Sequence, residues 1–353
     1  MAYTAIDNPE LYFQIKLYTG DGSTQSITLD GDEDMQPDFV WIKNRDQTDS
    51  HCLFDSVRTA TEVLHSDATT AETTDADTLT SFDSDGFALG ADVKVNTDTE
   101  AYVAWNWKAG TAFSNDASAT GVGSIDSSGS VNTDAGFSIV SYTGDAVYPS
   151  TVGHGLGSAP SVVITKQRTA GTYSWNLYHA GLGNTYYIGL NTTAAADNSV
   201  DCWNSTSPTS SVFTINAIAV NTSGVDFIAY CFADVAGYSK FSSYTGNGNA
   251  DGAFVYTGFR PAWVMAKRTD TTASWQISDN KRDTFNVVNK GLFADGNWAE
   301  SSSSSYYIDY LSNGFKLRNS AAWFNASGGT YIYMAFAEAP FVNSNGVPCN
   351  ARW

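Results

Sequence analysis

The sequence has few basic residues for its length. It contains 18 Lys and Arg against 37 Asp and Glu in 353 residues, which gives a net charge of -19. A chain with this charge repels both the phosphate backbone of nucleic acids and an anionic membrane surface. We therefore expect neither nucleic acid nor a lipid bilayer among its partners.

Cysteine is also scarce, and no two cysteines form a C-x-x-C pair. Zinc ribbons and redox-active dithiols depend on such pairs, so neither is indicated. The simplest structural interpretation is that the cysteines are buried, free thiols. They are Cys52, Cys202, Cys231 and Cys349.

A signal peptide and long apolar runs are missing as well. Residues 1–9 contain no basic region and no apolar core, and no later run is long enough to cross a bilayer. We expect a chain that is made in a cytoplasm, is not exported by the ordinary route and carries no disulfides.

Motifs for common enzyme chemistry are missing too. His51, His65, His154 and His179 lie in no H-x-H or H-E-x-x-H arrangement, and no G-x-S-x-G elbow occurs. The glycines at 153–157 are not followed by the Lys-Ser/Thr of a phosphate loop. Carboxylates are plentiful, but one sequence cannot place the pair that a glycosidase needs. No catalytic residue is predicted.

Three similar stretches are present instead. Each opens with an aromatic-Thr-Gly turn, continues through a proline and a β-branched run to Lys and Arg, and closes with an Asn before an aromatic segment. We interpret the glycine as supplying a positive φ and the proline as stiffening the next strand. The turns are Tyr18-Thr19-Gly20, Tyr142-Thr143-Gly144 and Tyr244-Thr245-Gly246.

The segments between the turns are typical of β-strands. They are short, rich in β-branched and aromatic residues, and bounded by Gly, Asn, Asp and Ser. Residues 55–64 fit either a short helix or a strand and turn. The alternation in residues 137–142 predicts a sheet with one face in a core and the other in water. We predict an all-β fold of three tandem antiparallel β-sandwich repeats, similar to jelly rolls.

The repeats divide the chain. We place repeat 1 at 1–110, a Gly/Ser/Asp-rich connector at 111–135, repeat 2 at 136–236, and repeat 3 with a C-terminal tail at 237–353. The tight join near Gly237 predicts a fixed interface between repeats 2 and 3. The connector, by contrast, leaves repeat 1 free to hinge.

Aromatic side chains in loop-like contexts are the best candidates for a binding surface, because rings beside Asn and Ser make good contacts for glycans and proteins. The alternative is that they fill cores and repeat interfaces. The candidates are Tyr173, Trp175, Tyr186, Tyr187, Trp203, Trp298, Tyr306, Tyr307 and Trp323.

One acidic run offers a weak candidate for calcium. Asp30, Asp32 and Asp34 carry the oxygen ligands that Ca²⁺ takes, but the run lacks the glycine and terminal Glu of a calcium-hand loop. A solvated acidic turn is the favoured alternative. No other metal or cofactor is predicted.

The repeated stretches also resemble a known family. The Tyr-Thr-Gly openings, residues 81–87, residues 102–110 and the ending at 340–348 are similar to an uncharacterised domain family common in marine bacteriophage genomes. The similarity covers essentially the whole chain. It implies a virion component, but it carries no catalytic residues to transfer.

From this resemblance we predict a non-enzymatic virion structural protein, a tail fibre or receptor-binding protein. Its partners would be other virion proteins and a host surface glycan or protein, contacted at several weak sites. A capsid decoration protein is the first alternative and a polysaccharide depolymerase the second. Assembly as a homotrimer stays open, because three repeats in one chain can also form a threefold unit alone.

Overall fold

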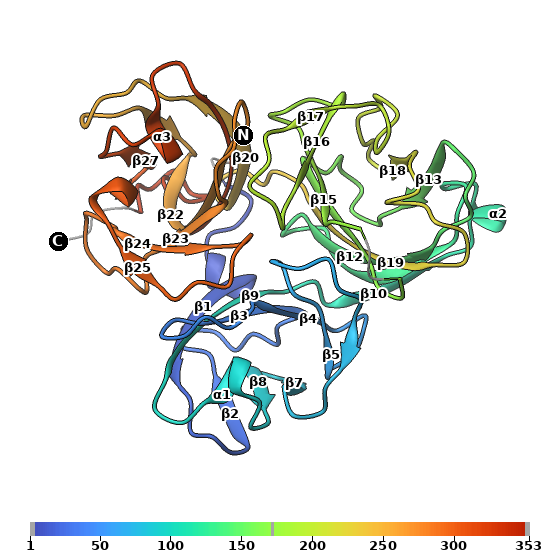
Figure 1. Ribbon diagram of the computed structural model, residues 1–353, viewed down its shortest axis with the longest axis horizontal. Helices are drawn as coiled ribbons and strands as arrows, with labels where there is room; N and C mark the ends of the chain where they lie inside the picture. Colours follow the sequence, from blue (N-terminus) through green and yellow to red (C-terminus); the bar gives the residue numbers. More distant parts are fainter. Residues whose placement is uncertain (1–3, 171–172, 350–353) are drawn as a thin grey trace.

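The computed structural model describes residues 4–170 and 173–349. Strands dominate these ranges, and the helices have three or four residues each (Figure 1). None of the helices described is long enough to cross a membrane. The predicted all-β class is confirmed. The first three residues of predicted repeat 1 and the last four of repeat 3 lie outside the described residues.

Lobe 1 (residues 4–110) has a four-stranded sheet, β1-β9-β3-β4, and a three-stranded sheet, β2-β8-β7. Residues 55–64 form the end of β4, a turn and the whole of β5 rather than a helix. The elements are η1 (Pro9–Leu11), β1 (Phe13–Thr19), β2 (Gln25–Thr28), β3 (Phe39–Asn44), β4 (Cys52–Asp55), β5 (Glu62–Val63), β6 (Thr73–Thr74), β7 (Leu79–Asp83), β8 (Gly86–Leu89), α1 (Val93–Asn96) and β9 (Ala101–Trp107).

Lobe 2 (residues 111–236) has an eight-stranded sheet, β10-β11-β12-β19-β14-β15-β16-β17, and the pair β13-β18. The elements are β10 (Thr111–Asn115), α2 (Ala117–Thr120), β11 (Ser127–Asn132), β12 (Phe137–Thr143), β13 (Ser150–Gly153), β14 (Val162–Gln167), β15 (Asn176–His179), β16 (Tyr186–Gly189), β17 (Asp197–Asn198), β18 (Val212–Ile215) and β19 (Asp226–Phe232).

Lobe 3 (residues 237–349) has a six-stranded sheet, β20-β28-β22-β23-β24-β25, and a three-stranded sheet, β21-β27-β26. The elements are β20 (Ser239–Thr245), β21 (Phe254–Tyr256), β22 (Phe259–Arg268), β23 (Gln276–Asp279), β24 (Lys290–Phe293), β25 (Ser301–Ser302), η2 (Ser304–Tyr306), β26 (Ile308–Leu311), β27 (Gly314–Leu317), α3 (Ala322–Asn325) and β28 (Thr330–Pro340).

The large sheets of the three lobes share one strand order. The common part is β1-β9-β3-β4 in lobe 1, β12-β19-β14-β15 in lobe 2 and β20-β28-β22-β23 in lobe 3. In Figure 1 the three lobes lie around a common centre. Strands with the same place in this order are called equivalent below.

A shared aromatic core joins the three lobes. It contains Trp105 and Trp107 of lobe 1, Phe232 of lobe 2, and Trp263 and Phe336 of lobe 3. The ring of Trp107 lies 6.4 Å from that of Phe232 and 5.7 Å from that of Trp263. Each lobe also has a core of its own between its two sheets. Each large sheet is therefore packed between two cores.

The large sheets are buried on both faces, so the predicted solvated face is wrong. On β12, Phe137 and Ile139 enter the shared core, whereas Val140 and Tyr142 enter the core of lobe 2. All six residues of β3 are buried. The face expected to meet water meets the other lobes instead.

The predicted connector, residues 111–135, is folded. β11 pairs antiparallel with β12 and extends the large sheet of lobe 2. Ile125, before β11, forms a parallel bridge with Val152 of β13. Because lobe 1 also contributes to the shared core, this packing contradicts a hinged first repeat.

The glycine of each Tyr-Thr-Gly turn is required by close packing of the backbone. A Cβ at Gly20 would lie 2.1 Å from the main-chain oxygen of Thr97, and Gly144 and Gly246 meet the equivalent carbonyl at 2.2 and 2.3 Å. None of the three has a φ in the left-handed region, so the predicted positive φ is wrong.

The asparagine that closes each stretch fixes the same turn. All three asparagines are buried. The side-chain oxygen accepts the N–H that follows the turn glycine: Asn96 from Asp21 at 2.9 Å, Asn221 from Asp145 at 2.9 Å and Asn325 from Asn247 at 2.8 Å. The two ends of each stretch are thus held together by one amide.

Candidate functional site

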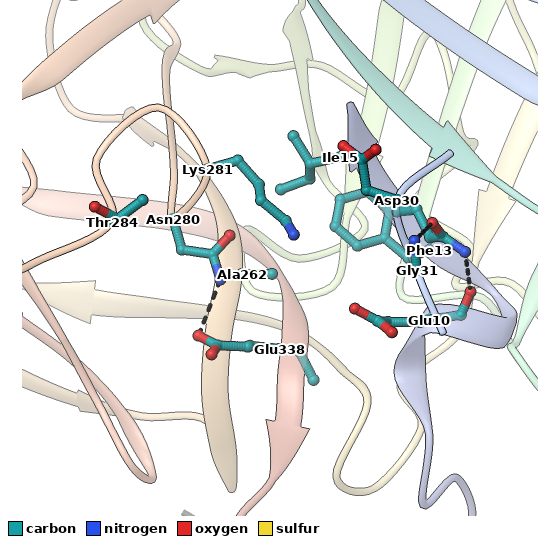
Figure 2. Close-up of a pocket in the computed structure, with 12 residues that line it drawn as sticks. Glu10, Phe13, Ile15, Asp30, Gly31, Ala262, Asn280, Lys281, Thr284 and Glu338 are labelled. Atoms are coloured by element: carbon teal, nitrogen blue, oxygen red, sulfur yellow. Dashed lines mark hydrogen bonds between the residues drawn. The ribbon is translucent and has the colours of Figure 1, made fainter. Parts of the chain in front are cut away.

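A cleft of about 220 Å³ lies between lobes 1 and 3 (Figure 2). Lobe 1 contributes η1, β1 and the loop after β2, and lobe 3 contributes β22, the loop after β23 and the end of β28. Buried Phe13, Ile15, Ala262 and Ala337 form its apolar part. Polar side chains from both lobes line the rest.

On the lobe 1 wall, Gln14 holds an acidic loop in place. Its Nε2 donates to the carbonyls of Glu10 at 2.9 Å and Glu33 at 3.1 Å, and its Oε1 accepts the N–H of Gly31 at 2.9 Å. A Cβ at position 31 would lie 2.5 Å from this amide, so the loop approaches as closely as it does because residue 31 is glycine. The loop thereby presents Asp30 at the cleft.

On the lobe 3 wall, Glu338 receives two partners. Asn280 Nδ2 donates to its carboxylate at 2.9 Å, and Arg260 Nε lies 2.8 Å from the same oxygen. The side-chain oxygen of Asn280 is buried and has no hydrogen-bond partner among the residues that the structure describes. An unsatisfied acceptor of this kind favours a ligand or water that donates to it.

The cleft combines charged and amide groups with an apolar floor. In Figure 2 the Lys281 side chain extends from the lobe 3 wall toward Glu10 and Asp30. Asp30 is also paired with Lys16. A small polyhydroxylated ligand suits this lining, because hydroxyls both donate and accept while the carbon skeleton covers apolar surface.

The carboxyl groups with a raised pKa lie elsewhere. Burial raises the pKa of Asp38 and Asp295, and neither residue lines the cleft. Asp38 accepts hydrogen bonds from the Ser56 hydroxyl and the Ala109 N–H, and Asp295 accepts from the Trp275 N–H. Both carboxyls therefore hold local structure, whereas a general acid must face its substrate.

Residues 8–340, nearly the whole chain, match the family model described as "Domain of unknown function (DUF7483)". The chain belongs to this family. No significant match to a curated protein or to a solved structure was found. The DUF7483 description gives no activity, so function has to be argued from the site.

Two of the nine candidate aromatics of this DUF7483 chain are buried, which contradicts their predicted surface role. Trp175 lies in the shared core, and its indole N–H donates to the His65 carbonyl of lobe 1 at 2.9 Å. Trp203 packs in the core of lobe 2, edge-on to Tyr178. Both lie in polar sequence, but their rings turn inward.

The other seven are partly or largely exposed, and none lines the cleft. Trp298, 49% exposed, packs with Tyr306 on the ring of Phe293. Tyr187 donates to Asp197 at 2.9 Å. Trp323 is 47% exposed on α3. Tyr173, Tyr186 and Tyr307 are half-buried.

Tyr187 lines a more open groove of about 360 Å³ in lobe 2, together with Ser174, Thr192 and Asp197. Burial, and then its hydrogen bond to Asp197, raises the pKa of Tyr187 to about 12. The candidate aromatics are therefore spread over separate places and form no single surface with the cleft.

The weak calcium candidates do not converge. Asp30 is paired with Lys16, and the Asp32 N–H donates to Glu10. Within residues 4–170 and 173–349, no group of three or more His, Cys, Asp or Glu is placed to hold a metal. Whether Asp34 or its neighbours bind calcium stays a prediction.

The cysteines are unpaired, and three of them are buried as expected. Burial raises the pKa of Cys202 and Cys231 to about 12, which suppresses the reactive thiolate. Cys349 is exposed, so the expectation of burial is wrong for it.

A buried ionic network between lobes 1 and 2, the 1/2 interface, was not predicted. Arg58 pairs with Asp55 and, at 2.9 Å, with Glu72, which pairs with Arg168 of lobe 2 at 2.8 Å. The Tyr230 hydroxyl of lobe 2 donates to Asp55 at 2.7 Å. Burial opposes ionisation of Glu72, but hydrogen bonds from Arg168 and the charge of Arg58 outweigh it and lower its pKa.

The 3/1 interface, between lobes 3 and 1, carries the same network. Arg282 pairs with Asp279 at 2.6 Å and with Glu300 at 3.1 Å, and Glu300 pairs with Arg45 of lobe 1 at 2.8 Å. The indole N–H of Trp105 donates to Asp279 at 3.1 Å. Burial of Glu300 is again outweighed, first by its hydrogen bond with Arg45, so its pKa is lowered.

The 2/3 interface, between lobes 2 and 3, has uncharged residues at the equivalent places. His179 pairs with the first residue of β14, as Asp55 pairs with that of β3. The Ala196 N–H donates to the Thr269 carbonyl, as the Glu72 N–H donates to that of Arg168. Leu182 follows His179 at the spacing of Arg58 after Asp55.

His179 is held as a neutral ring. Its Nε2 donates to the Tyr333 carbonyl of lobe 3 at 3.1 Å, and its Nδ1 accepts the Gly181 N–H at 3.0 Å. Burial lowers the pKa of His179 to about 4, against the opposing hydrogen bond to Tyr333. One neutral histidine thus replaces the carboxylate of the other two interfaces.

Proposed function

We propose that this DUF7483 chain is a non-enzymatic structural protein of a bacteriophage particle, a tail fibre or receptor-binding protein that contacts the host cell surface. The particle is taken from the resemblance carried by the Tyr-Thr-Gly stretches and their flanking segments. The structural role is supported by the way the lobes are joined.

The observation that carries the structural role is the single core shared by three lobes. The ion pairs Glu72–Arg168 and Glu300–Arg45 link lobes rather than facing a cleft. A chain built in this way holds its outer loops in fixed relative positions. Fixed, repeated loops suit adhesion through several weak contacts on one particle.

The cleft between lobes 1 and 3 supplies a candidate contact for a host-surface saccharide. Its support is the lining. The oxygen of Asn280, which no described residue contacts with a hydrogen bond, the ammonium of Lys281 and the carboxylates of Glu10 and Glu338 surround an apolar floor. The hydroxyls of a sugar can bond to these polar groups, and its carbon atoms can cover the apolar floor.

Gold labelling of intact virions with an antibody to this chain, viewed by electron microscopy, tests the proposal. We expect label at the tail. Label spread over the head would overturn the tail assignment and favour capsid decoration. Particles without label would contradict a virion role.

The saccharide contact is tested by measuring binding of the purified chain to host-surface polysaccharide. The double variant Asn280→Ala with Lys281→Ala should bind at least tenfold more weakly. Lys240→Ala is the matched control, because Lys240 pairs with Asp234 and does not line the cleft. Equal binding by both variants would remove the cleft from the proposal.

A further inference from the structure

The small sheets of the three lobes end in equivalent edge strands. β2, β13 and β21 each lie at one end of their sheet and pair with β8, β18 and β27. In each pair, one residue of the edge strand lies opposite a buried phenylalanine of the neighbouring strand. These residue pairs are Ile27 and Phe87, Val152 and Phe213, and Val255 and Phe315. The residues on either side of these positions can therefore be compared directly.

In lobe 2 the outer edge of β13 is covered by residues 122–127, which we call the strap. The N–H groups of Ser124 and Ile125 donate to the Thr151 carbonyl at 2.8 and 3.1 Å. The Ser124 hydroxyl accepts the Thr151 N–H at 2.8 Å, and the Ser127 hydroxyl donates to the Gly153 carbonyl at 2.8 Å. Ile125 is 7% exposed and joins the core of lobe 2.

In lobe 3 the sheet ends at β21 within the described residues. The Thr257 N–H donates to the Asn313 carbonyl at 3.0 Å, next to β27. Successive N–H groups along a strand point to opposite edges. Because the Thr257 N–H points toward β27, the N–H groups of Phe254 and Tyr256 point to the outer edge. The Tyr256 carbonyl receives a long contact of 3.5 Å from the Tyr333 hydroxyl.

The side chains on this edge are large and apolar. Phe254 is 47% exposed and Tyr256 is 62% exposed. The equivalent residues of lobe 1, Ser26 and Thr28, are small and polar. Exposed aromatics on an unpaired strand edge promote pairing with another chain, and proteins usually avoid them. Lobe 3 keeps them where lobe 1 does not.

Building on the proposed virion function, we propose that the outer edge of β21 binds an extended segment of another virion polypeptide, which adds a strand there. On β13 the strap covers the same edge with main-chain hydrogen bonds and one bridge between Ile125 and Val152. The occupant is a run of small residues with an aliphatic side chain, because residues 122–127, Val-Gly-Ser-Ile-Asp-Ser, cover the equivalent strand in lobe 2. Main-chain hydrogen bonds would supply affinity, and the rings of Phe254 and Tyr256 would cover the added strand.

A fluorescently labelled peptide with the sequence of residues 121–132 is the probe, and anisotropy with the full chain is the readout. We expect saturable binding. The double variant Phe254→Lys with Tyr256→Lys should weaken it at least tenfold, because charge on an edge strand disfavours an added strand. The control is Ser26→Lys with Thr28→Lys on β2, which should bind as the unaltered chain does.

A milder variant keeps the test valid if the lysine variant does not fold. Phe254→Ser with Tyr256→Thr copies the edge of lobe 1 and should also lose binding at least tenfold. No saturable binding, unchanged binding in the β21 variants, or equal loss in the β2 control would overturn the proposal. Self-association of the unaltered chain that the β21 variants abolish would also overturn it, since a second copy would then be the occupant.

Discussion

The 1/2 and 3/1 interfaces are held by buried Asp-Arg-Glu-Arg networks, whereas the 2/3 interface has His179, Leu182, Ala196 and Thr269 at the same places. Lobes 2 and 3 follow each other directly through Gly237. Between β9 of lobe 1 and β12, the first common strand of lobe 2, the chain first forms β10, α2 and β11, whereas only residues 233–238 lie between β19 of lobe 2 and β20 of lobe 3. Lobes 3 and 1 are not consecutive. The charged networks thus occur where the chain itself does not bring the lobes together.

This difference suggests what the charges do. A buried ion pair contributes little net stability, because desolvation offsets attraction, but removing one partner leaves a costly unpaired charge. Such a network therefore destabilises an incorrect lobe arrangement, in which a charge stays unpaired, more than it stabilises the correct one. We therefore expect Arg58 and Arg282 to specify which lobes meet, a task that the short join already performs for lobes 2 and 3.

The largest effect is expected from Arg58→Ala. It leaves Asp55 and Glu72 buried without their shared cation, which should lower the free energy of unfolding by about 3 to 5 kcal/mol. Urea unfolding at pH 7 measures it. Leu182→Ala, at the equivalent place of the 2/3 interface, should cost clearly less because no charge loses a partner. Equal costs would remove the distinction between the interfaces.

His179 should make the 2/3 interface sensitive to acid. Its pKa is about 4 in the folded chain and about 6.5 when unfolded, so the unfolded state takes up the proton first as the pH falls. Stability should be complete above pH 6.5 and fall by about 3 kcal/mol by pH 4. Denaturant unfolding at a series of pH values measures this loss.

The variant His179→Gln should remove the share of His179 from the loss between pH 6.5 and 4.5. Burial also lowers the pKa of His51 and His154, so a smaller loss remains in the variant. Below this range the unaltered chain and the variant should lose stability in parallel, because the lowered pKa values of Glu72 and Glu300 favour the folded state only while both are ionised. A variant with an unchanged pH profile would show that His179 is not the sensor.

Tyr230→Phe should have a smaller effect. The change removes the hydroxyl that donates to Asp55 across the 1/2 interface, and hydrogen bonds to charged groups contribute about 1.5 to 3 kcal/mol. Tyr333→Phe is the control, since its hydroxyl bonds to neutral groups, the Tyr256 carbonyl at 3.5 Å and Ser242. Thermal unfolding of both variants compares them. A larger loss in the control would contradict the role assigned to Tyr230.

The smallest effect is expected when the whole 1/2 network is exchanged for the residues of the 2/3 interface. The fourfold variant Asp55→His, Arg58→Leu, Glu72→Ala, Arg168→Thr should stay within about 1 kcal/mol of the unaltered chain, because complete removal of a buried network leaves no unpaired charge. Urea unfolding checks this. A loss as large as that of Arg58→Ala would show that the network itself stabilises the fold.

The strands could be predicted from the sequence because their residues are distinctive. Runs such as 39–44 and 331–337 are β-branched and aromatic, and polar turns separate them. The shared core between the lobes could not be predicted, because an alternating pattern shows that a strand has two faces but not what covers each face. Phe137 and Val140 fit a half-solvated sheet as well as a sheet between two cores.

The sites were harder to predict because they combine distant residues. Glu10 and Glu338 line the same cleft from opposite ends of the chain, and no local pattern joins them. The two ionic networks did leave a signal: Asp55 and Arg58 have the same spacing as Asp279 and Arg282. Trp175 was misplaced because polar neighbours indicate a loop but not the direction of a ring.

Differential scanning calorimetry of the intact chain tests most directly whether the three lobes form one unit. A core shared by all lobes predicts a single transition in which the calorimetric and van't Hoff enthalpies agree. Two or three separate transitions, or a van't Hoff enthalpy well below the calorimetric one, would show that the lobes unfold independently and contradict the shared core as the element that joins them.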